Sequence, residues 1–256
     1  MSSSLHLMIS LYLFVVGLVF GSFATLVGDR VVRSESIVHP GSHCTNCGRK
    51  LRGHELIPVI SWLVLRGRCA TCKHDISVRY PAQELTLAIA VVLSFWQEPS
   101  IFTAIVSCFL WFVFVIAMST DFTALIVPNW LTYSSAFVIY VAMILVCHSV
   151  WKPLVGMFVG FMMIFLVHIL SKGKMGLGDA KLYLSIGAFL GPALTVESFV
   201  VAAFIGTSVG GTLRFTKRLP ANHYIPFVPF IVASVGLTQF ILNGVPAWYE
   251  HVVLGL

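Results

Sequence analysis

Two aspartates stand at the ends of apolar segments, where a charged residue is costly. Asp121 closes one such segment and Asp179 opens another. A carboxylate in a membrane span costs roughly 2.5 to 3.5 kcal/mol on insertion scales, so each of them needs an explanation. Two carboxylates within a few ångströms share a proton, so that one can act as general base on a water while the other donates to a carbonyl oxygen. The two aspartates are therefore candidates for hydrolytic chemistry.

The residues around the aspartates favour an irregular backbone. Gly176 and Gly178 precede the second aspartate and permit close approaches that a side chain would block. Pro128 interrupts the helix expected after the first aspartate, and irregular backbone at membrane depth is tolerated where it lines a wet cavity. The alternative is that both aspartates only mark helix ends, with Lys181 as an ion-pair partner of the second.

Four of the six cysteines form two C-x2-C pairs, Cys44 with Cys47 and Cys69 with Cys72. Two such pairs can supply a tetrahedral thiolate site for Zn²⁺, although the 21 residues between them slightly exceed the usual zinc-ribbon spacing. Such a closed site leaves no position for water, so its metal would be structural. Disulfides are the alternative, and a reducing cytosol disfavours them.

The composition predicts that these residues are positioned by membrane helices. The 256 residues are 58% hydrophobic and only 10% charged, whereas soluble domains are roughly 25% charged. We therefore predict an all-α polytopic membrane protein with about eight transmembrane helices and a cytoplasmic zinc-binding loop. The expected spans are residues 5–27, 81–96, 101–119, 127–148, 153–170, 180–194, 196–213 and 225–242.

The basic residues predict the orientation of these spans. Nine of the sixteen lie between Arg30 and Arg79, and alternation through eight spans leaves only Lys152 on the opposite side. By the positive-inside rule the cysteine loop is cytoplasmic and both termini are non-cytoplasmic. Topology thus explains the net charge of +6 without nucleic-acid binding. The expected division is a first helix (1–28), the four-cysteine loop (29–80) and a multi-helix core with both aspartates (81–256).

Together these motifs resemble the bacterial type IV prepilin peptidases over nearly the whole chain. Thr25 stands where the first family motif usually has Asn. The matching segments are Gly21-Ser22-Phe23, the run 44–81 that continues to Glu84, Asp121 with Val127-Pro128-Asn129, Gly176-x-Gly178-Asp179-x-Lys181, and Ile225-Pro226-Phe227-x-Pro229-Phe230.

The resemblance implies an aspartic endopeptidase of the bacterial inner membrane, with Asp121 and Asp179 as its catalytic pair. Its substrates would be prepilins or pseudopilins of pilus, type II secretion or competence systems, cleaved after a short basic leader. It would also methylate the new N-terminal amine with S-adenosylmethionine. The implied site-shaping residues are Gly176, Gly178, Lys181, Pro128, Asn129 and Glu84, and the implied structural zinc ligands are Cys44, Cys47, Cys69 and Cys72. Candidate contacts for the basic leader are Glu55, Asp75 and Glu84.

Two other classes of protein fit part of the pattern. A presenilin-like intramembrane protease shares the Gly-x-Gly-Asp motif but would not need the cysteine loop. A zinc-ribbon membrane scaffold or transporter would use the aspartates to bind cations, yet the inverted repeats of many transporters are not evident here.

Overall fold

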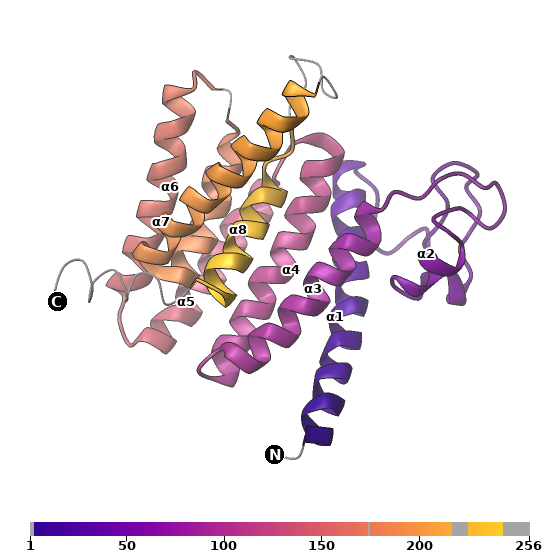
Figure 1. The fold of residues 1–256 in the computed structure, drawn as a ribbon, viewed down its shortest axis with the longest axis horizontal. Helices are drawn as coiled ribbons and strands as arrows, with labels where there is room; N and C mark the ends of the chain where they lie inside the picture. The colour runs from indigo at the N-terminus through magenta and orange to yellow at the C-terminus, as the bar shows by residue number, and fades with distance from the viewer. Residues whose placement is uncertain (1–2, 174, 217–224, 243–256) are drawn as a thin grey trace. The chain divides into compact units, whose positions relative to one another are not determined.

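The computed structural model describes residues 3–173, 175–216 and 225–242, which form helices joined by loops (Figure 1). In this described part the β-pairing is limited to two isolated bridges within the cysteine loop. The all-helical class expected from the sequence is thus confirmed. The chain divides into two compact units, residues 1–124 and 125–256, which we describe separately.

Three long helices build the first unit: α1 (Ser3–Val32), α3 (Arg79–Gln97) and α4 (Ile101–Ala124). Each packs against the other two (Figure 1). Small residues on α1 allow this packing, since a Cβ added to Gly17 would lie 2.6 Å from the Cα of Ala88 in α3. Close van der Waals contact is a main source of helix association in a membrane.

The polar loop between α1 and α3 contains the 3-10 helix η1 (Gly53–Leu56) and the short helix α2 (Ile60–Val64). In Figure 1 it projects from the end of the unit where α1 finishes and α3 begins. Arg30, which is buried in α1, holds the first part of this loop through hydrogen bonds. Its guanidinium donates, over 2.6 to 3.1 Å, to the backbone carbonyls of Ser36, Ile37 and Pro40.

Four helices build the second unit: α5 (Asn129–Cys147), α6 (Trp151–Leu170), α7 (Leu177–Phe215) and α8 (Val228–Phe240). Helix α7 packs against the other three. The backbones of α6 and α7 touch where two glycines meet, since a Cβ added to Gly156 would lie only 2.1 Å from the carbonyl oxygen of Gly187. Larger residues at this crossing would push the two helices apart.

Helix α7 is broken at Gly191, whose φ of 75° and ψ of 176° are non-helical. Glycine adopts this backbone without the clash that a Cβ would cause, and Pro192 follows directly. A straight helix of 39 residues would be about 58 Å long, nearly twice the thickness of a bilayer core. The two arms correspond to the expected spans 180–194 and 196–213, with the interruption a few residues earlier than predicted.

Five of the described helices are long and apolar enough to cross a membrane: α1, α4, α5, α6 and α7. Helix α3 covers the expected span 81–96 but is not among them, because its first two turns carry Arg79, Gln83 and Glu84. Helix α8 is apolar but has only 13 residues. These helices make the chain a polytopic helical membrane protein.

Candidate active site and metal centre

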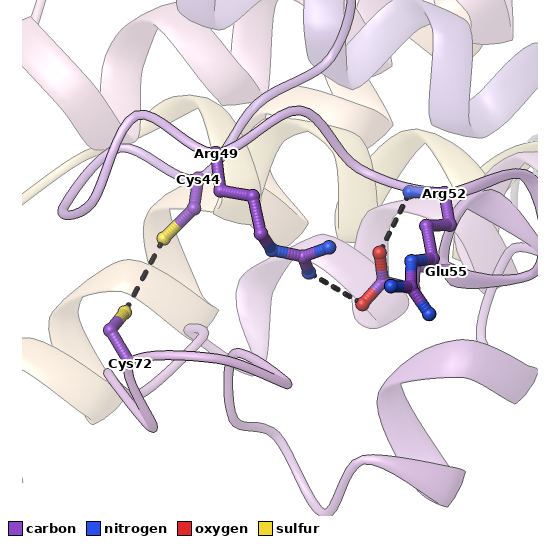
Figure 2. A network of polar contacts seen from close by, with 5 residues as sticks. All are labelled: Cys44, Arg49, Arg52, Glu55 and Cys72. Carbon is purple, nitrogen blue, oxygen red and sulfur yellow. Dashed lines mark hydrogen bonds and ion pairs between the residues drawn. The ribbon is translucent and has the colours of Figure 1, made fainter.

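The four paired cysteines come together in the loop of the first unit. The sulfur atoms of Cys44, Cys47, Cys69 and Cys72 all lie within 4.8 Å of one another. Those of Cys44 and Cys72 are 3.8 Å apart, and Figure 2 marks the contact between them. A tetrahedral zinc site with Zn–S bonds of about 2.3 Å places its sulfurs about 3.8 Å apart. The cluster therefore has the donor set and the spacing of a four-thiolate metal site.

The same backbone turn forms both halves of this cluster. The N–H of Gly48 donates to the carbonyl of Cys44 over 2.9 Å, and the N–H of Lys73 donates to that of Cys69 over 3.1 Å. Both donors occupy the left-handed region, with φ of 68° at Gly48 and 57° at Lys73. The glycine suits this conformation, whereas a lysine adopts it only where the surrounding structure requires it. Each C-x2-C pair therefore lies in a tight knuckle closed by its own backbone hydrogen bond.

Backbone donors favour thiolates in the second pair. Hydrogen bonds from the N–H groups of Cys72 and Thr71 hold the pKa of the Cys69 thiol at about 6. The backbone of His74 and the side chain of Asn46 likewise lower the pKa of Cys72. Because the thiolate is the form that binds a metal, these hydrogen bonds favour metal binding by Cys69 and Cys72.

A half-buried ion pair lies in the loop beside the cluster. The guanidinium of Arg49 contacts Glu55 at 2.7 Å, and the N–H of Arg52 donates to the other carboxylate oxygen at 2.7 Å (Figure 2). The contact with Arg49, followed by that with Arg52, holds the pKa of Glu55 below its usual value. This carboxylate is engaged within the loop, and Asp75 pairs with Arg68 at 3.1 Å. Glu55 is therefore not free to bind a basic leader, whereas the side chain of Asp75 is 84% exposed and its contact with the leader stays a prediction.

Asp121 lies in the last turn of α4 in the first unit and is only 5% exposed. The guanidinium of Arg79, at the start of α3, donates to the carbonyl of Phe122 over 3.4 Å. A cation at the end of α4 compensates for carbonyl groups that have no partner within the helix. This contact lies at the helix end that carries the first aspartate.

Asp179 lies in the first turn of α7 in the second unit and is 7% exposed. Helix α7 begins after Gly176, and a Cβ on that glycine would lie 3.5 Å from one carboxylate oxygen of Asp179. An acidic side chain at this position is favoured by the positive end of the helix dipole. The imidazole of His168 holds the preceding segment, with Nδ1 2.5 Å from the carbonyl of Met175.

Parts of the two aspartate motifs meet within the second unit. The ammonium of Lys181 donates to the side-chain carbonyl of Asn129 over 2.7 Å. One turn earlier, a Cβ on Gly178 would lie 3.1 Å from the Cβ of Val127. These two contacts join the start of α7 to the start of α5, where Pro128 precedes the first helical residue. Lys181, Asn129 and Gly178 are thus brought together.

Glu84 belongs to the first unit and lies beside the cysteine loop, where its carboxylate accepts the N–H of Val59 over 2.8 Å. Near it is an acidic residue that sequence reasoning missed, Asp29 of α1. The Tyr80 hydroxyl donates to Asp29 over 2.5 Å, and Ser119 and Thr123 of α4 donate at 2.9 and 3.2 Å. Nothing in the sequence singles out Asp29, because a charged residue at the end of a span is common.

Two families match adjacent parts of the chain. The bacterial peptidase A24 N-terminal domain matches residues 15–98, and the type IV leader peptidase family matches residues 107–211. The first match contains the cysteine loop and the second contains both Asp121 and Asp179.

Curated relatives match along most of the chain. A protein of Bacillus subtilis named prepilin leader peptidase/N-methyltransferase is 32% identical over 95% of this chain and 98% of its own length. Proteins with the same name from Vibrio cholerae and Pseudomonas putida are 30% and 31% identical. They are matched over 88% and 76% of this chain and over 94% and 70% of their own lengths. No solved structure matches the chain significantly.

Proposed function

We propose that this chain, which belongs to the type IV leader peptidase family, is a membrane aspartic endopeptidase that removes the short basic leader from type IV prepilins or pseudopilins. We further propose that it methylates the N-terminal amine that cleavage exposes. The name of the Bacillus subtilis relative gives both activities, and this chain covers 98% of that relative.

The peptidase reaction needs a base and an acid at one scissile bond, and we assign these roles to Asp121 and Asp179. The ionised carboxylate takes a proton from water as the water oxygen attacks the carbonyl carbon, while the protonated carboxyl donates to the carbonyl oxygen. The C–N bond then breaks, and the leaving amine takes up a proton. The burial of each carboxylate at a helix end supports this assignment, because acidic residues in membrane segments are costly and mark function.

The observation that carries this assignment is the meeting of the two motifs in the second unit. Lys181 and Gly178 flank Asp179, and they contact Asn129 and Val127 of the motif that Asp121 begins. We assign a site-shaping role to these contacts and to Gly176 and Pro128, which precede α7 and α5. Glu84 has a different role in this proposal, because its carboxylate anchors the cysteine loop at Val59.

We assign Zn²⁺ to the four cysteines, as a structural ion. Four thiolates close the coordination shell, so the ion would hold the two knuckles together without contributing an open catalytic position. The sulfur spacing and the lowered pKa of Cys69 support this assignment.

The proposed topology has eight crossings of the bacterial inner membrane. Helix α7 would cross twice, once with each arm, and α3 and α8 would complete the set; the break at Gly191 supports this count. The cysteine loop would be cytoplasmic and both termini non-cytoplasmic, which the distribution of basic residues supports. The proposed parts are a first helix (1–28), the loop (29–80) and the peptidase core (81–256).

The methyl donor in this proposal is S-adenosylmethionine. The free amine attacks the methyl carbon as the C–S bond breaks, the electron pair remains on sulfur, and the product ammonium releases one proton to water. Cleavage must come first, because the amine that accepts the methyl group is part of the scissile peptide bond until then.

A reconstituted assay tests both activities together. The protein in nanodiscs would be mixed with a prepilin with and without the methyl donor, and the products identified by mass spectrometry. We expect cleavage after a glycine in both mixtures, and one added methyl group only where the donor is present. Folded protein that leaves the prepilin intact under both conditions would refute the proposed peptidase.

A further inference from the structure

The first unit contains a cavity of about 470 Å³ between the ends of α1 and α3 and the cysteine loop. This volume falls within the range of about 300 to 1,000 Å³ that is common for small-molecule sites. Its walls are mixed in chemistry: five carboxylates, three guanidinium groups and several aromatic rings line it. Those that bear on ligand binding are the carboxylates of Asp29 and Glu84, the guanidinium groups of Arg33 and Arg79, and the rings of Trp62 and Tyr80.

The two carboxylates give the cavity a preference for a cation. Glu84 is 8% exposed, and its carboxylate accepts the backbone N–H of Val59 at 2.8 Å. Asp29 is held by three hydroxyl groups, at 2.5, 2.9 and 3.2 Å. The ion pairs of the described residues are Arg49–Glu55 and Arg68–Asp75, so neither carboxylate is neutralised by a basic side chain there. A buried carboxylate is stabilised most by a cation, which a ligand can supply.

The loop wall of the cavity is held in a strained shape. Val59 has φ of 60° and ψ of −51°, and the N–H of Ile60 donates to the carbonyl of Pro58 across it at 2.5 Å. This is the rare form of γ-turn, which a β-branched residue adopts only when its surroundings impose it. The turn directs the N–H of Val59 at Glu84. The carboxylate of Glu84 is therefore held in place both by its own helix, α3, and by the turn in the cysteine loop.

The remaining groups suit a ligand that also carries a flat ring and a carboxylate. The indole N–H of Trp62 donates to the carbonyl of Ile76 over 2.9 Å, which fixes the ring in the wall. The guanidinium carbon of Arg79 lies 5.4 Å from the centre of the Tyr80 ring. Aromatic faces bind planar rings and sulfonium-like cations, and guanidinium groups bind carboxylates.

We propose that this cavity holds the methyl donor, an adenosyl sulfonium with an amino-acid tail. The inference rests on the methyl transfer proposed above and gives it a site. Asp29 and Glu84 supply the negative field for the sulfonium and the ammonium, the two arginines face the tail carboxylate, and the aromatic rings receive the adenine. Transfer leaves a neutral thioether, so the donor loses the charge that these carboxylates recognise and the product is released more easily.

Direct binding to the full-length protein tests the role of the charge. Isothermal titration in nanodiscs would compare sinefungin, which keeps a cation in place of the sulfonium, with S-adenosylhomocysteine, which is neutral there. We expect the wild type to bind sinefungin about tenfold more tightly, and Asp29→Asn to lose most of this preference. Glu98→Gln, which removes a carboxylate after the far end of α3, should keep it. A wild-type preference that survives in both Asp29→Asn and Glu84→Gln would overturn the proposal.

Photolabelling of the wild type provides a test that does not depend on variant folding. An 8-azido derivative of the donor would be crosslinked and the labelled peptides mapped by mass spectrometry. We expect label on peptides that contain Trp62 or Tyr80, and label confined to residues 125–256 would overturn this assignment while methylation itself stands. A wild type that cleaves prepilin but neither methylates it nor binds the donor would instead refute the proposed methyltransferase.

Discussion

Substituting Gly178 with alanine perturbs the second aspartate without touching its carboxylate. The added Cβ would lie 3.1 Å from the Cβ of Val127 and 3.3 Å from its Cγ2. Carbon atoms in favourable contact are about 3.5 to 4.0 Å apart, so the first turn of α7 must move by roughly half an ångström. A displacement of about 1 Å can cost about a hundredfold in rate, so we expect Gly178→Ala to slow cleavage about tenfold.

The assay is single-turnover cleavage of a prepilin, with thermal unfolding followed in parallel. Gly211→Ala, in the second arm of the same helix, is the matched control, because a Cβ added there would have no neighbour within 4 Å. Adding Val127→Ala to Gly178→Ala removes one of the clashing atoms and should restore part of the rate, which a double-mutant cycle measures. Equal rates for the wild type and Gly178→Ala would refute the argument that this contact positions Asp179.

Two further predictions concern packing and the metal. Gly156→Ala should destabilise the second unit by about 1 to 3 kcal/mol, because its Cβ would meet the Gly187 carbonyl at 2.1 Å. Gly211→Ala, where the added Cβ has open space, should leave the stability unchanged. Equal melting temperatures of the wild type and Gly156→Ala in detergent would contradict this prediction. Cys69→Ser should release bound zinc and make the loop more sensitive to protease, whereas Cys147→Ser in α5 should do neither; full zinc content in Cys69→Ser would show that the four sulfurs are not the ligands.

The sequence predicts those parts of the fold and site that depend on local chemistry. Two C-x2-C pairs determine a four-sulfur cluster because each knuckle is closed by hydrogen bonds within a few residues. Long apolar runs predict membrane helices because the backbone hydrogen bonds of a helix also join residues only four positions apart. The break in α7 is also local, since Gly191 and Pro192 disfavour a straight helix together.

The features that the sequence does not predict depend on residues far apart in the chain. Asp29 is held by hydroxyl groups 51 to 94 residues away. Glu55 differs, because its partners Arg49 and Arg52 lie only six and three residues away; an acidic residue in a polar loop suggests an exposed contact, and the residue type alone does not show that it is buried. The γ-turn at Val59 gives no signal in the residue type, because its conformation is imposed by the surroundings.

The most direct test of the central claim is prepilin cleavage by Asp121→Asn and Asp179→Asn, each reconstituted in nanodiscs. Both substitutions keep the side-chain shape, and unfolding temperature and zinc content would show that the protein is intact. Loss of a catalytic acid or base costs about 10²- to 10⁴-fold, so we predict that each single variant is at least a hundredfold slower, while Glu98→Gln cleaves normally. Cleavage near the wild-type rate by either folded aspartate variant would contradict the assignment of the pair.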